Sequence, residues 1–126
     1  IDKLDNYSSK RRENFKYYIS KLKTNKLFLE EKSNDYVSSF AIPVVHSKRN
    51  DIIRDLQDEG IEVRPLIAGN MANKPMWYGR QRKLGRVDGN LENCELLDKQ
   101  GFYVPNHQDI SKEDIDKIVN IINDYE

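Results

Sequence analysis

Short apolar segments at 36–45, 61–66 and 102–105 alternate along the sequence with longer segments of helical spacing. In the first segment Phe40, Ile42 and Val44 alternate with smaller or polar residues, which predicts a strand with one buried face. Pro43 lacks an N–H group, so this strand is expected at a sheet edge or beside an irregularity. Three strands with helices on one face predict an α+β two-layer sandwich around a small, mainly antiparallel sheet.

Four helices are predicted, over residues 3–23, 48–59, 90–100 and 111–122. Gly60 follows the second helix as a left-handed terminator. Cys94 lies with leucines on the inward face of the third helix, so we expect a buried, small apolar role for it. Ser111 and Asp114 resemble a capping box at the start of the last helix, whose isoleucines form an amphipathic face.

Residues 67–89 show no period and contain four glycines and a proline, which predicts a long loop. A loop of this length within a compact domain is commonly functional or dependent on a partner. Its apolar residues have no periodic place in the core, so we expect the loop to pack on a partner surface. A basic and aromatic cluster in it could contact a nucleotide, or could equally pack on another domain or subunit: Trp77, Tyr78, Arg80, Arg82 and Lys83.

The composition limits the classes of function that remain. The 126 residues are enough for one domain, and 21 basic residues balance 21 acidic ones, which argues against a dedicated nucleic-acid binder. A single cysteine cannot form an internal disulfide, and no run of 18 apolar residues predicts a membrane span. A cytoplasmic location is expected, and neither a phosphate-binding loop nor a metal motif is present.

A few polar residues could bind a ligand. Arg64 ends a short apolar strand and could hold a carboxylate or phosphate with its planar guanidinium, although a surface ion pair is the plainer alternative. The small residues Ala68, Gly69 and Asn70 form a turn whose backbone could approach a ligand closely, or an ordinary turn. His46 is interpreted as structural or simply exposed, and His107 lies in a loop where binding residues are common.

Several phrases of the sequence resemble one protein family. They are the segment from Gly60 to Asn70 (GIEVRPLIAGN) with Lys74-Pro75, the segment from Tyr103 to Asp116 (YVPNHQDISKEDID), and the segment from Lys10 to Asn14 (KRREN). In this order they resemble the C-terminal small domain of the DegT/DnrJ/EryC1/StrS family of PLP-dependent nucleotide-sugar aminotransferases and dehydratases. The resemblance covers nearly all of residues 1–126, with residues 1–25 as the helix that links to the large domain and 36–126 as the sheet, its helices and the 67–89 loop.

The resemblance implies a division of labour. The family's cofactor-anchoring residues lie in the large domain, so we expect no catalytic or cofactor-binding residue here and no PLP or PMP bound to this chain alone. Four residues are implied to face the substrate: Arg64, Asn70, Asn106 and His107. The implied partners are the PLP-binding large domain of the same parent, a second copy in a homodimer, a nucleotide sugar and an amino donor.

The resemblance favours a sugar aminotransferase acting on a nucleotide-linked 4-keto-6-deoxy sugar, in lipopolysaccharide or polysaccharide biosynthesis. In such an enzyme the small domain would close the substrate pocket and aid dimerisation. A PMP-dependent sugar 3-dehydratase is the near alternative. A free-standing α+β binding module is the alternative from another class.

Overall fold

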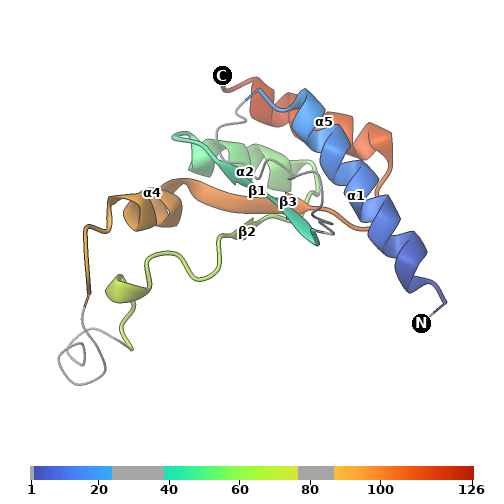
Figure 1. Cartoon of the computed structure of the whole chain (residues 1–126). Helices are drawn as coiled ribbons and strands as arrows, with labels where there is room; N and C mark the ends of the chain where they lie inside the picture. Colours follow the sequence, from blue (N-terminus) through green and yellow to red (C-terminus); the bar gives the residue numbers. More distant parts are fainter. Residues whose placement is uncertain (1, 24–38, 77–86) are drawn as a thin grey trace.

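The computed structural model describes residues 2–23, 39–76 and 87–126 of the chain. Their elements follow one another in the predicted alternation of helices and strands (Figure 1). In chain order they are α1 (Leu4–Lys21), β1 (Ala41–Val45), α2 (Arg49–Asp58), β2 (Arg64–Pro65), the 3₁₀ helix η1 (Met71–Asn73), α4 (Glu92–Gln100), β3 (Gly101–Pro105) and α5 (Lys112–Asn123).

In the described part of the chain, three strands form one antiparallel sheet in the order β1-β3-β2. The last strand of the sequence therefore lies in the centre, and the other two are edges. Pro43 faces Tyr103 across the ladder. Because β1 is an edge strand, the missing N–H group of Pro43 is tolerated, as predicted.

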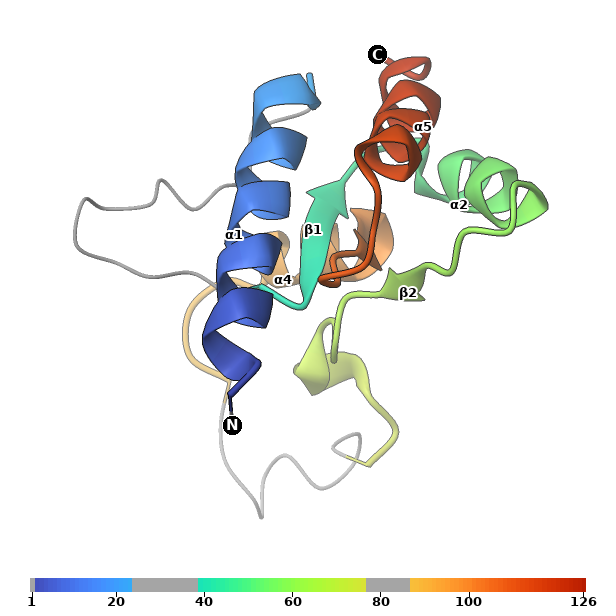
Figure 2. The same cartoon turned by 90° about the vertical axis from the view of Figure 1, so that its right-hand side faces the viewer.

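The core lies between one face of the sheet and the helices α1, α2 and α5 (Figure 2). The register pairs Ile42 with Val104 and Val44 with Phe102, so four apolar side chains share this face. Helix α5 presents four fully covered residues to it, in agreement with its predicted amphipathic face: Ile115, Ile118, Val119 and Ile122. The α+β sandwich with helices on one face of a small sheet is confirmed.

The beginning of α5 carries the predicted capping box. The Ser111 hydroxyl accepts the Asp114 N–H at 3.0 Å, and the Asp114 carboxylate accepts the Ser111 N–H at 3.3 Å. The Ser111 hydroxyl also donates to the Asp114 carboxylate at 2.7 Å, and this bond first, then the bond from the Ser111 N–H, lowers the pKa of the Asp114 carboxyl. Local chemistry therefore fixes where α5 begins.

Helices α1 and α5 run side by side in the same direction. The Tyr17 hydroxyl donates to the Asp116 carboxylate at 2.9 Å, and the Asn123 amide donates to the Lys21 carbonyl at 3.0 Å. Deeper in the core the Tyr18 hydroxyl donates to the Pro105 carbonyl at 2.9 Å. Burial raises the pKa of the Tyr18 phenol, so it stays a donor.

Both edge strands are shorter than predicted. The strand expected from residue 36 begins at Ala41, and residues 36–38 lie outside the described part. Phe40, expected to point inward, is 69% exposed. The strand expected over 61–66 is confined to Arg64 and Pro65, because only these two residues pair with β3. Gly60 has φ 74° and follows the end of α2 as predicted.

The burial of Cys94 is wrongly predicted, since its side chain is exposed. Helix α4 lies beyond the end of the sheet where β3 begins, away from the three core helices (Figure 1), and none of its residues is buried. The spacing of its apolar residues predicted a buried side for this helix, and the structure does not bear that out.

The long loop at 67–89 contains η1, which the sequence did not predict. Residues 77–86, and with them the cluster of Trp77, Tyr78, Arg80, Arg82 and Lys83, lie outside the described residues. Among the helices that are described, none is both long enough and apolar enough to cross a membrane.

Candidate functional site

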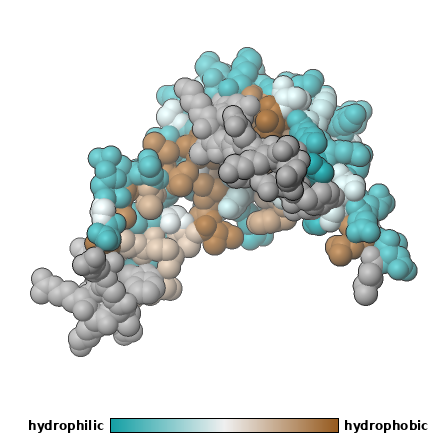
Figure 3. Space-filling model, viewed as in Figure 1, coloured by the Kyte–Doolittle hydropathy of each residue, from teal (hydrophilic) through white to brown (hydrophobic). Residues whose placement is uncertain are grey.

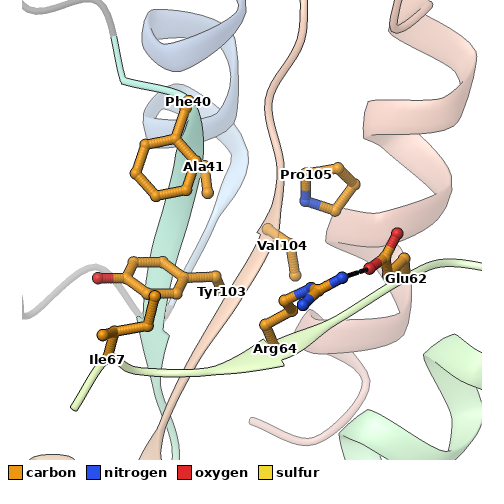
Figure 4. Close-up of a pocket in the computed structure, with 8 residues that line it drawn as sticks. All are labelled: Phe40, Ala41, Glu62, Arg64, Ile67, Tyr103, Val104 and Pro105. Carbon is orange, nitrogen blue, oxygen red and sulfur yellow. Dashed lines mark hydrogen bonds and ion pairs between the residues drawn. The ribbon is translucent and has the colours of Figure 1, made fainter. Parts of the chain in front are cut away.

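The face of the sheet opposite the core helices carries a hollow of about 240 Å³. Figure 3 shows apolar residues gathered in the middle of the molecule, between α4 and α1. We call the hollow the open-face pocket (Figure 4). Its lining combines aromatic, aliphatic and charged residues from β1, β2 and β3 and the segments beside them: Phe40, Ala41, Glu62, Arg64, Ile67, Tyr103, Val104 and Pro105.

Arg64 stands on the side of the pocket formed by β2. It pairs with Tyr103 in the ladder, which places both residues on the open face. Its Nε donates to the Glu62 carboxylate at 2.9 Å, and the Arg64 side chain is 73% exposed. The surface ion pair considered from the sequence is therefore present. Because an exposed pair of this kind contributes little to stability, an anionic ligand could replace Glu62 as the partner of Arg64 at small cost.

Aromatic rings form the opposite side of the pocket. The rings of Phe40 and Tyr103 lie 5.9 Å apart between centroids and are tilted by 46°. Ile67 is 78% exposed and lies beside Tyr103 (Figure 4). Apolar surface beside a guanidinium suits a ligand that has both a flat or apolar part and a negative charge.

Asn70 is buried, with 2% of its surface exposed, and lies on the α4 side of the molecule rather than in the open-face pocket. Its Oδ1 accepts the Ala72 N–H at 3.1 Å and so caps η1. Its Nδ2 has no hydrogen-bond partner among the described residues. The structure thus gives Asn70 a local structural role, and substrate binding by Asn70 stays a prediction.

Asn106 is 1% exposed and joins three segments. Its Nδ2 donates to the carbonyl of Arg11 in α1 at 3.1 Å and to the carbonyl of Ser39 before β1 at 2.8 Å. Its own position follows directly after β3. In this arrangement the amide holds the sheet against α1, and a role toward substrate stays a prediction.

His107 follows Asn106 and is exposed. Its carbonyl accepts the Asn14 amide at 3.0 Å, and its Nδ1 accepts the Asp109 N–H at 3.3 Å. His107 also lines a second hollow, of about 370 Å³, between the 59–62 segment and α5. This hollow and the open-face pocket share Glu62 and Pro105.

The four predicted substrate residues are therefore not one cluster. Arg64 and His107 line neighbouring hollows, whereas the side chains of Asn70 and Asn106 are buried and bond to the backbone of the domain itself. His46 is a structural residue, since its Nδ1 accepts the Lys48 N–H at 3.0 Å at the start of α2. The other residues that complete the open-face pocket were not predicted from the sequence. Alternation along the 102–105 strand is a signal that could have identified Tyr103 as facing away from the core, but nothing local indicates its neighbours.

Comparison with known proteins shows where this fold belongs. The sequence model of the DegT/DnrJ/EryC1/StrS aminotransferase family matches residues 1–123. Since the match covers almost the whole chain, the chain belongs to the DegT/DnrJ/EryC1/StrS family.

Curated relatives give a finer view. The chain is 29% identical over 129 aligned residues to the GDP-4-keto-6-deoxy-D-mannose 3-dehydratase of Escherichia coli O55:H7, covering 97% of this chain and 32% of that protein. It is 24% identical to the lipopolysaccharide biosynthesis protein RfbH of Salmonella typhimurium, covering 99% of this chain and 30% of that protein. The chain therefore spans about a third of the length of these relatives.

Solved structures agree in fold. The E. coli GDP-4-keto-6-deoxy-D-mannose-3-dehydratase with bound hydrated PLP superposes with a TM-score of 0.77 at 27% identity, over 96% of this chain and 32% of that one. A DegT/DnrJ/EryC1/StrS aminotransferase from Brucella abortus superposes with a TM-score of 0.78 at 18% identity, over 98% of this chain and 32% of that one. The second likeness shows the fold alone.

Proposed function

We propose that this chain is the C-terminal small domain of a PLP- or PMP-dependent enzyme that acts on a nucleotide-linked 4-keto-6-deoxyhexose. One observation carries the choice of reaction. Identity is 27–29% to GDP-4-keto-6-deoxy-D-mannose 3-dehydratases along nearly the whole chain, but 18% to the aminotransferase with the same fold. This difference favours a 3-dehydratase over the aminotransferase that the sequence alone placed first.

The cofactor does not fit among the described residues of this chain. Apart from the Tyr18 hydroxyl, which donates to Pro105, their buried polar side chains are three asparagines, Asn14, Asn70 and Asn106, and no described lysine is buried. A PLP phosphate and ring need buried donors and cations, and a covalent link needs a shielded amine. We therefore place PLP or PMP in the large domain of the parent polypeptide and assign no cofactor chemistry to this segment.

The contribution of this domain would be to complete the substrate site. The open-face pocket leaves Phe40 and Ile67 uncovered, and exposed apolar groups of this size commonly mark an interface. We propose that the large domain covers this face and that the nucleotide sugar lies between the two. Arg64 would then exchange Glu62 for an anionic group of the substrate, while Asn70, Asn106 and His107 would support or border the same site.

Dimerisation of the parent and a cytoplasmic location complete the proposal. The long loop is the segment we propose to reach the large domain or the second copy, since Met71 and Met76 are exposed at its described end. A polysaccharide-building pathway agrees with the likeness to RfbH, which is named for lipopolysaccharide biosynthesis.

The test is a product analysis with the polypeptide that carries this chain. It would be incubated with GDP-4-keto-6-deoxy-D-mannose, PLP and glutamate, and the nucleotide sugars would be resolved by mass spectrometry. A product that has lost the oxygen at C3 is expected. A product with nitrogen in place of the keto oxygen would identify an aminotransferase instead, and unchanged substrate would overturn the proposal. Reactions without PLP or without glutamate serve as controls.

A further inference from the structure

The segment after β2 is attached to α4 through one acidic side chain. We propose that Asp98 is a positioning residue, which fixes the 69–74 loop on α4 and so sets the place of Ile67 at the edge of the open-face pocket. No sequence motif indicated Asp98. Its effect on a substrate site rests on the proposed function, but its effect on the loop can be measured on this chain alone.

Asp98, in α4, bonds to two separate parts of the chain, the 69–74 loop and the start of α2. Its Oδ1 accepts the Lys74 ammonium at 3.0 Å, and its carboxylate also accepts the backbone N–H of Asn70. Its backbone carbonyl accepts Nη1 of Arg49, at the start of α2, at 2.7 Å. The loop, α4 and α2 therefore meet at this residue, and charge assists the contacts.

The loop is shaped to approach Asp98 closely. Gly69 has φ 67°, a conformation that side chains disfavour, and a Cβ atom placed on it would lie 1.7 Å from Asp98 Oδ1. Only glycine permits both this backbone angle and this approach. Directly after it, the Asn70 side chain caps η1, so the ordered geometry continues to Lys74.

Apolar packing cannot supply the same restraint. Helix α4 has no buried residue, and Leu66, which contacts Gly101, precedes the loop. Among the described residues, most exposed large apolar side chains lie on this part of the molecule: Ile67, Met71, Met76, Val87 and Leu96. Because these groups are not packed against a core, polar bonds at Asp98 decide the position of the loop.

The experiment compares amide exchange and chemical shifts by NMR in the 126-residue chain and its variants. In Asp98→Ala the exchange of the Asn70 and Lys74 amides should accelerate about tenfold, the effect of losing a partly exposed charge-assisted bond. Exchange in α5 should stay unchanged. Glu95→Gln is the matched control, since it removes an exposed carboxylate from the same helix, and it should leave the loop unaltered.

A pH titration provides a readout that a general loss of stability would not alter. The pKa of the Asp98 carboxyl is lowered mainly by its hydrogen bond with Lys74. The backbone N–H of Asn70 lowers it next, and the charge of Arg49 lowers it least. The Asn70 amide resonance should therefore move as Asp98 titrates in acid, and this step should vanish in Asp98→Asn. In Lys74→Ala the step should move to higher pH.

Two results would overturn the proposal. One is amide exchange in the 69–74 loop of Asp98→Ala that is as slow as in the unsubstituted 126-residue chain. The other is equal acceleration in the loop and in α5, which would make Asp98 a residue of global stability. Since neither measurement involves a substrate, failure of the enzymatic assay would leave the exchange results unaffected.

Discussion

Replacing Asn106 tests whether this motif residue serves the fold, because its amide bonds to carbonyl groups of two other segments. In Asn106→Ala the Ser39 carbonyl loses its side-chain donor inside the protein, which costs about 1–3 kcal/mol. The Arg11 carbonyl stays within helix α1, so the loss of the Asn106 donor there costs only about 1 kcal/mol of stability. Removing Oδ1, which is buried and has no hydrogen-bond partner among the described residues, offsets about 1 kcal/mol.

The expected net loss is therefore about 2 kcal/mol in the free energy of unfolding. At a urea dependence of about 1–3 kcal/mol per molar, the unfolding midpoint should fall by roughly 1 M. Asn106→Asp should lower the free energy of unfolding further at neutral pH, because a buried carboxylate would face two carbonyl oxygens. Protonation restores a donor, so the deficit of this variant should shrink as the pH falls.

The assay is urea unfolding followed by far-ultraviolet circular dichroism. Asn123→Ala is the matched control: its amide also bonds to two backbone groups, the Lys21 carbonyl and the Lys23 N–H, each at 3.0 Å, but in an exposed setting. The free energy of unfolding of Asn123→Ala should fall by less than about 1 kcal/mol. A loss in Asn106→Ala no larger than in Asn123→Ala would refute the structural reasoning and return Asn106 to the substrate site.

Three further predictions concern the site, the cofactor and a helix end. In the whole enzyme, Arg64→Ala should lower kcat/KM about 30- to 1,000-fold, and Arg64→Lys should recover only part of it, because the ammonium lacks the planar fork. The melting temperature should hardly change in either variant, and normal kinetics in both would remove Arg64 from the site. The purified chain, titrated with PLP, should show no visible absorption band that saturates at one equivalent and disappears on replacing a single lysine. Ser111→Ala should destabilise the chain by about 1 kcal/mol in urea unfolding, and an unchanged midpoint would contradict the capping role of its hydroxyl.

The fold was predictable where its causes are local. The beginning of α5 follows from Ser111 and Asp114, and its buried face follows from the spacing of its isoleucines. The same reasoning failed for Cys94, because spacing identifies the apolar side of a helix but not whether another element covers it. The short β2 has a similar cause, since a strand ends where its neighbour stops pairing.

The site was predictable only in part, for a related reason. The position of Arg64 at the end of a strand is visible in the sequence, and so is the loop that carries His107. The partners of Asn106 lie 67 and 95 residues away in sequence, and Lys74 is 24 residues from Asp98. No short phrase encodes such pairs. The family resemblance located Asn70 and Asn106 as substrate residues without showing that both side chains are buried in the domain's own packing.

The central place of β3 has a consequence for synthesis of the chain. Within the described residues, strands β1 and β2 pair only with β3, whose first residue is Gly101. A ribosome therefore releases both outer strands, and the apolar side of α1, before the segment that joins them exists. Until residues 101–105 emerge, the ladder has no template, and the covering isoleucines of α5 come later still. Assembly of this sheet therefore depends on one late five-residue segment, so a slow step in translating that segment would delay the entire sandwich.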